Sequence, residues 1–123
     1  MSKGWEQVAL VSDATAGAGL GEGGAFHLGT LPCRIEGGAA WTEQESGRCL
    51  AGSTSFLFDG IKTMVTQVGV PIEEAVGMAS LVPARSLGLE GKLGSIAPGK
   101  IANLMRFSNQ WEIRDVWIKG KKF

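Results

Sequence analysis

A short apolar run close to the N-terminus, residues 8–11 (VALV), gives the strongest single strand signal in the chain. It has no polar break, which is the pattern of a strand buried on both faces of a parallel sheet. Asp13 follows where the run stops, and residues 14–24 are too rich in glycine to continue a strand or start a helix. The pattern therefore predicts a carboxylate at the C-terminal end of a buried strand, where α/β proteins form active sites. The spacing alone favours a turn or helix-cap role for Asp13, because aspartate often takes those roles.

The next part of the chain reads as a small antiparallel meander. Three short runs, Ala25–Leu28, Leu31–Glu36 and Ala39–Thr42, are separated by turn residues, and Gly37-Gly38 is a two-residue hairpin signal. Pro32 predicts either an edge position for its strand or restricted pairing near the start of that strand.

The second half of the chain is predicted to begin with a helix and to end with two strands. Gly69 is the natural stop for the helix. Residues 102–107 and Ile113–Ile118 read as the strands, followed by a basic turn at residues 119–122. The apolar positions of the helix recur at helical spacing, and they are Leu57, Ile61, Met64, Val65 and Val68.

A second helix is predicted directly after the first. Pro71 suits its first position, and Pro83 is expected to end it. Pro83 can also start a short third helix over residues 84–87, which Gly88 would close. The predicted buried stripe of the second helix consists of Ile72, Ala75, Val76 and Ala79, with Met78 close by.

Composition narrows the class of protein. The 123 residues suffice for one modest domain, and the charges balance, 12 basic against 12 acidic. This balance offers no basic surface for nucleic acid or for a membrane, and no apolar run approaches the length of a membrane span. We therefore expect a cytoplasmic protein. Cys33 and Cys49 lack a metal-type spacing and are expected to be free thiols.

Four segments, taken in order, resemble one family of enzymes. The last two are similar to the C-terminal signature of the amidohydrolase superfamily, and the first two to the N-acetylglucosamine-6-phosphate deacetylases within it. The resemblance runs over nearly the whole chain, from Val8 to Phe123. The segments are residues 10–15 (LVSDAT), 50–53 (LAGS), 78–85 (MASLVPAR) and 93–100 (LGSIAPGK).

The resemblance implies an α/β fold with a (β/α)8 barrel and a small β-sandwich. A barrel needs about 250 residues, so we expect not a complete TIM barrel but the C-terminal third of such an enzyme. The expected single domain, residues 1–123, would hold the last barrel strand and active-site loop (1–20), the β-meander (21–48), the covering helices (49–92) and the C-terminal sandwich strands (93–123).

The resemblance also implies roles for particular residues. The family's aspartate after the eighth strand takes a proton from a metal-bound water and later gives one to the departing amine, and Asp13 matches it. Leu50, Ala51 and Gly52 match a loop that contacts the sugar substrate. The full-length family uses a zinc-like divalent metal, whose histidine and glutamate ligands lie on earlier strands. His27 is the one histidine here and is expected to be structural, so we expect no metal ligand and no metal in the isolated chain.

Several functions stay open at this point. The chain is either part of a deacetylase of amino-sugar phosphates, one piece of a split enzyme that needs an N-terminal partner, or a non-catalytic remnant that oligomerises or binds a ligand. We expect the isolated chain to be inactive. A different amidohydrolase, dihydroorotase-like or imidazolonepropionase-like, is the runner-up, because residues 94–100 are shared among these enzymes. A strand at residues 8–11 without neighbours also predicts a homo-oligomer.

Overall fold

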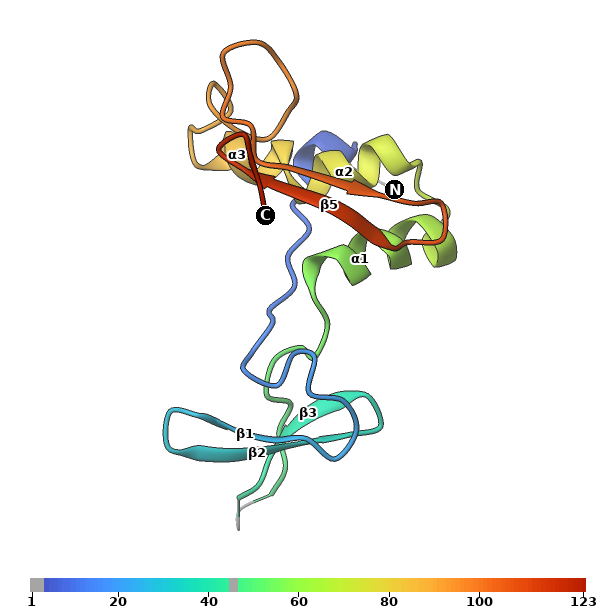
Figure 1. Ribbon diagram of the computed structural model, residues 1–123. Helices are drawn as coiled ribbons and strands as arrows, with labels where there is room; N and C mark the ends of the chain where they lie inside the picture. Colours follow the sequence, from blue (N-terminus) through green and yellow to red (C-terminus); the bar gives the residue numbers. More distant parts are fainter. Residues whose placement is uncertain (1–3, 45–46) are drawn as a thin grey trace. The chain divides into compact units, whose positions relative to one another are not determined.

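The glycine-rich part of the chain forms the predicted antiparallel meander. In the computed structural model, which describes residues 4–44 and 47–123, strands β1 (Ala25–Leu28), β2 (Leu31–Glu36) and β3 (Ala39–Thr42) pair in the order β1-β2-β3 (Figure 1). Gly37 and Gly38 have φ values of +61° and +75°, which a two-residue hairpin turn requires. The three predicted strands are therefore confirmed.

Pro32 lies in β2, the central strand, so of the two predicted alternatives the edge position is wrong and restricted pairing near the start of the strand is confirmed, since the register with β3 begins only at Cys33. Its carbonyl accepts a hydrogen bond from the Glu43 N–H (2.8 Å), just beyond the end of β3. The proline nitrogen faces the same side, because the N–H and C=O of a strand residue point together. The N–H that proline lacks would therefore point to a place where β3 has already ended, so no hydrogen bond between β2 and β3 is lost.

Contacts group the residues into two compact units, Val11–Gly60 and Met1–Leu10 with Ile61–Phe123. The first unit is built around the inner face of the meander. Cys33 is buried in this face and Cys49 is exposed, and both are free thiols as predicted. The buried cluster consists of Phe26, Cys33, Ile35, Ala40 and Ala51.

Helix α1 (Leu57–Thr63) continues into a π-helical turn, η2 (Met64–Val68), and the two together fill the predicted helix. Gly69 ends it with φ +80°, as expected of a glycine C-cap. At the start of the helix, the Asp59 carboxylate accepts a hydrogen bond from the Phe56 N–H (2.9 Å). The last turn was not predictable as π-helical, because five residues make little more than one turn of either helix type and so show no repeat of the apolar pattern.

Helix α2 (Ile72–Ala79) supplies the core of the second unit. Ala75 and Met78 are its most buried residues, with 0% and 1% of their surface exposed, whereas Ile72, predicted to be buried, is 38% exposed at the first position of the helix. The buried cluster consists of Ile61, Val70, Ala75 and Met78.

Helix α3 (Leu81–Ser86) begins two residues before Pro83, so the prediction that it starts at Ala84 is wrong. Pro83 lies in the first turn, where its missing N–H costs no intrahelical hydrogen bond. Ser80 separates α2 from α3 with a non-helical φ of −132°. Gly88 closes the segment with φ +67°, as predicted.

The N-terminal 3₁₀ helix η1 (Trp5–Gln7) packs on α2 through Trp5. A Cβ on Gly77 would lie 2.4 Å from Cζ3 of that ring. We therefore expect Gly77→Ala to lower the free energy of unfolding by about 1–3 kcal/mol, although alanine is the better helix former. Urea unfolding measures the effect, with Gly91→Ala as the control because nothing lies within 4 Å of that position. A Gly77→Ala midpoint equal to that of Gly91→Ala would show that Trp5 moves aside at no cost.

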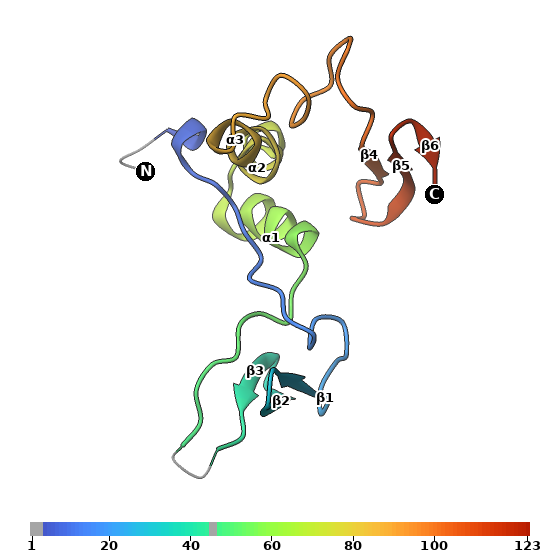
Figure 2. The same ribbon diagram turned by 90° about the vertical axis from the view of Figure 1, so that its left-hand side faces the viewer.

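Residues 8–11 are not a strand, which corrects the prediction of a last barrel strand buried on both faces. The segment is irregular, without a strand arrow (Figure 2). Val8 and Leu10 are half-buried on the Met78 cluster, and the Leu10 N–H donates to the Met78 carbonyl (2.8 Å). Ala9 is exposed and Val11 is 74% exposed. A sheet strand needs a ladder on its edges, and in the described part of the chain no strand pairs with residues 8–11.

A second antiparallel sheet ends the chain. Strands β4 (Leu104–Phe107), β5 (Ile113–Ile118) and β6 (Lys121–Lys122) pair in the order β4-β5-β6. The bounds of β5 are as predicted, β4 starts two residues later than predicted, and the predicted basic turn contains the short strand β6. With two small sheets, the described residues form no closed barrel, as their number implies.

Asp115 is buried in β5 between two cations of the neighbouring strands. The Lys122 ammonium lies 2.5 Å from one carboxylate oxygen, and Arg106 Nε donates to the other at 2.6 Å. The hydrogen bond from Lys122, together with Arg106, holds the pKa of the Asp115 carboxyl below its ordinary value against the opposite effect of burial. The charged carboxylate therefore stabilises the fold at pH values above the unfolded-state pKa of about 4, and this contribution is lost as the pH falls through the lower folded-state pKa.

Asp115→Asn is accordingly expected to lower the urea midpoint at pH 7, with the gap to the parent chain closing as the pH falls below about 4. Glu112→Gln on the same hairpin is the matched control, because the Glu112–Arg114 pair is more than half exposed and contributes little. A gap for Asp115→Asn that stays constant from pH 7 to pH 3 would contradict the assignment.

Candidate functional site

Asp13 is exposed and is held through its backbone by a segment 40 residues further along the chain. Its carbonyl accepts a hydrogen bond from the Ser53 N–H (2.8 Å), and the Thr15 N–H donates to the Ser53 carbonyl (3.2 Å). Together these bonds form an isolated parallel bridge between Ala14 and Ser53. The structure therefore brings two of the four quoted segments, LVSDAT and LAGS, into direct contact.

Gly52 lies against Asp13 and Thr15 with no space for a side chain. Its φ is +72°, and a Cβ there would lie 2.5 Å from Cγ2 of Thr15 and 2.9 Å from the carbonyl oxygen of Asp13. The same Cβ would lie 3.4 Å from Oδ2 of Asp13, so the carboxylate is an immediate neighbour of Gly52.

Leu50 and Ala51, the other candidate substrate residues, point elsewhere. The Leu50 side chain is 66% exposed, and its backbone forms an antiparallel bridge with Trp41. Ala51 is 3% exposed within the meander core, and its N–H donates to the Ala40 carbonyl (2.8 Å). Of the three residues, Gly52 is thus the one that lies against the Asp13 carboxylate, whereas Leu50 presents its side chain to solvent.

Thr15 and Ser53 belong to this site but were not predicted as functional residues. Both lie inside the quoted motifs, next to Asp13 and Gly52, and the signal that could have singled them out is this adjacency. The Thr15 hydroxyl donates to the Ser53 carbonyl (3.4 Å), which adds a side-chain bond to the backbone pairing. Ser53 acts through its backbone N–H and its carbonyl, groups that the sequence does not distinguish from those of any other residue.

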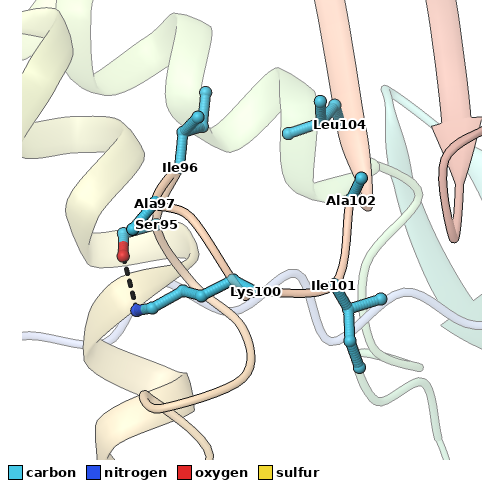
Figure 3. A pocket seen from close by; sticks show the side chains of 7 residues that line it. All are labelled: Ser95, Ile96, Ala97, Lys100, Ile101, Ala102 and Leu104. Carbon is cyan, nitrogen blue, oxygen red and sulfur yellow. Dashed lines mark hydrogen bonds between the residues drawn. The ribbon is translucent and has the colours of Figure 1, made fainter.

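A small hollow in the second unit was considered as a binding site. It has a volume of about 70 Å³, room for a few water molecules. Lys100 Nζ donates to Ser95 Oγ (2.6 Å) and to the Glu90 carbonyl, so the ammonium group closes the turn (Figure 3). The lining residues are Ser95, Ile96, Ala97, Lys100, Ile101, Ala102 and Leu104. The hollow therefore reflects the folding of the 93–100 signature and is not a candidate active site.

Comparison with known proteins decides the family. The sequence pattern of the Amidohydrolase family matches residues 8–123. The chain belongs to the amidohydrolase family. Among amidohydrolase relatives, the N-acetylglucosamine-6-phosphate deacetylase of Vibrio furnissii is 36% identical over 115 residues, which are 94% of this chain and 28% of that protein. The N-acetylgalactosamine-6-phosphate deacetylase of Escherichia coli O157:H7 is 36% identical over 116 residues, 94% of this chain and 30% of that protein.

Solved structures agree with the sequence relatives. The crystal structure of N-acetylglucosamine-6-phosphate deacetylase from Pasteurella multocida superposes with a TM-score of 0.85 at 30% identity, covering 96% of this chain and 30% of that chain. Among the sequence relatives, the putative N-acetylgalactosamine-6-phosphate deacetylase of Escherichia coli strain K12 is also 36% identical, and this chain covers 67% of its length. This amidohydrolase chain thus spans less than a third of most of the relatives named here.

Amidohydrolases generally bind a divalent metal. Within residues 4–44 and 47–123, no group of three or more His, Cys, Asp or Glu side chains gathers where it could hold a metal ion. His27 is exposed on β1, in register with Pro32. The described residues therefore do not fit a metal site of their own, and the chemistry proposed below uses the Asp13 carboxylate alone. Within the same residues, no helix is long and apolar enough to cross a membrane.

Proposed function

We propose that this chain is the Asp13-bearing part of an amidohydrolase that removes the acetyl group from an N-acetylated amino-sugar phosphate, with N-acetylglucosamine-6-phosphate as the substrate. The observation that carries the proposal is the contact between the Asp13 segment and Gly52-Ser53. It unites the candidate acid–base group and the candidate substrate loop. The names of the relatives support the substrate class, since they are deacetylases of amino-sugar phosphates.

In the proposed reaction, Asp13 acts first as a general base and then as a general acid. The carboxylate accepts a proton from water as the water oxygen adds to the acetyl carbonyl carbon. The carbon–nitrogen bond then breaks, and Asp13 returns the proton to the departing nitrogen. The products are acetate and the free amino sugar phosphate. Leu50 and Gly52 would line the substrate, Leu50 with an exposed side chain and Gly52 with its backbone.

The proposal includes a partner. Since the chain covers 28% of the Vibrio furnissii enzyme, we propose that the remaining barrel strands, and with them the metal ligands of the family, come from sequence outside these 123 residues or from a second chain. The isolated chain is then inactive, and the protein acts in the cytoplasm on a small-molecule substrate.

The proposed function is tested by a chimera in which residues 8–123 replace the matching part of the Vibrio furnissii deacetylase. Hydrolysis is measured with N-acetylglucosamine-6-phosphate, N-acetylgalactosamine-6-phosphate, unphosphorylated N-acetylglucosamine and dihydroorotate. We expect turnover of a phosphorylated amino sugar above that of the other two compounds. A chimera that opened dihydroorotate instead would favour the runner-up within the amidohydrolases.

A further inference from the structure

We propose that Gly52 is a positioning residue: its missing side chain lets the Asp13–Thr15 segment lie where the Asp13 carboxylate is correctly aimed. The proposal rests on the acid–base role proposed for Asp13. It differs from the substrate-contact role implied by the family resemblance, because the close approach that Gly52 permits is to the protein's own chain.

The steric argument concerns one methyl group. An alanine Cβ at position 52 would lie 2.5 Å from Cγ2 of Thr15, whereas ordinary carbon contacts begin near 3.4 Å. One of the two segments would therefore have to move by roughly 1 Å, a displacement that can cost about a hundredfold in rate at an active site. The Asp13 carbonyl oxygen, at 2.9 Å, is backbone and cannot rotate out of the way.

The backbone of Asp13 shows why this segment needs such support. Its φ of +50° lies in the left-handed region, which a non-glycine residue adopts at a cost. The Ser53 N–H bond to the Asp13 carbonyl (2.8 Å) and the Thr15 N–H bond to the Ser53 carbonyl (3.2 Å) lie on either side of the bridge. They hold Asp13 in this conformation only while Gly52 leaves the two segments in contact.

The first test uses the 123-residue chain and needs no catalysis. The readouts are the ¹³C chemical shift of the Asp13 carboxyl carbon and the hydrogen exchange of the Ser53 amide. Gly52→Ala is expected to shift the carboxyl signal and to speed Ser53 exchange at least about tenfold, since the bridge opens more often. Gly21→Ala is the matched control, because Gly21 has a similar φ of +78° and nothing lies within 4 Å of an added Cβ.

A second substitution separates the steric effect from a general loss of structure. Thr15→Ser removes the methyl group that the new Cβ would strike and keeps the hydroxyl. The double variant Gly52→Ala/Thr15→Ser is expected to bring the Asp13 carboxyl shift and the Ser53 exchange rate part of the way back to the values of the parent chain. If Gly52→Ala alone does not fold, the double variant takes its place in the test. Gly52→Ala readouts that match those of Gly21→Ala would overturn the proposal, as would a double variant without recovery.

The second test uses the chimera and distinguishes positioning from substrate contact. A positioning role predicts that Gly52→Ala lowers kcat whether or not KM changes as well, whereas a pure substrate contact predicts a raised KM with kcat unchanged. The second outcome, with an unshifted Asp13 signal, would contradict the proposal. The first test measures the contact between Gly52 and the Asp13–Thr15 segment without any turnover. An inactive chimera would therefore count against the proposed function, and it would not change the result of the first test.

Discussion

Replacement of Asp13 by asparagine is expected to lower kcat for acetate release in the chimera by about 10²–10⁴-fold, the usual contribution of a general acid–base. The amide has nearly the shape of the carboxylate but cannot accept a proton from water. Because the backbone bond between Asp13 and Ser53 does not involve the side chain, the fold should be unaffected. Asparagine also tolerates the left-handed φ of +50° at this position. Steady-state kinetics and urea unfolding of the same preparations measure the two effects.

Asp59→Asn is the control for this substitution. Asp59 caps the start of α1 by accepting the Phe56 N–H, so its replacement changes the same atoms at a structural position. We expect Asp59→Asn to retain turnover and to lose at most about 1 kcal/mol of stability. Near-normal turnover in Asp13→Asn, or an equal loss in both variants, would remove Asp13 from the proposed mechanism.

The second large effect concerns association. We expect the isolated chain to form a two-fold dimer through residues 8–11, since Val11 is 74% exposed in a segment that pairs with no strand of the described residues. Val11→Lys is expected to give a monomer, because it places a charge on the exposed side of that segment. Light scattering after size-exclusion chromatography at about 50 µM, a range in which weak dimers still form, measures the difference.

Leu10→Lys provides the comparison that separates association from folding. Leu10 packs on the Met78 cluster and donates its N–H to the Met78 carbonyl, so a lysine there should also lower the free energy of unfolding, by about 1–3 kcal/mol. Val11→Lys should spare that cluster. A parent chain that is already monomeric at this concentration, with Val11→Lys unchanged, would show that residues 8–11 do not mediate self-association.

The elements that the sequence predicts best are those with local causes. The hairpin at Gly37-Gly38 and the helix stop at Gly69 follow from glycines with positive φ, and neither needs a partner far along the chain. The start of helix α3 was placed at Ala84 and not at Leu81, because the sequence indicates that Pro83 can open a helix but not which position of the first turn it takes. The prediction of a strand at residues 8–11 was wrong because it depended on contacts far along the chain. A parallel strand exists only where neighbouring strands supply its hydrogen-bond ladder.

The sequence indicated some of the residues that belong to the candidate site but not how they contact one another. Asp13 and Gly52 were singled out by their motifs, but no local pattern indicates that residues 13–15 pair with Ser53 across 40 positions. The exposure of the Leu50 side chain and the burial of Ala51 were likewise beyond the sequence. The burial of Ala51 in the meander core depends on how the segment after β3 folds back along that strand.

The central claim is that residues 8–123 can serve as the Asp13-bearing part of an amino-sugar phosphate deacetylase. Acetate release from N-acetylglucosamine-6-phosphate by the chimera, compared with the Vibrio furnissii remainder alone, tests it most directly. The account predicts turnover within about a hundredfold of the natural enzyme, and none from the remainder. A folded chimera that releases no more acetate than the remainder would contradict it.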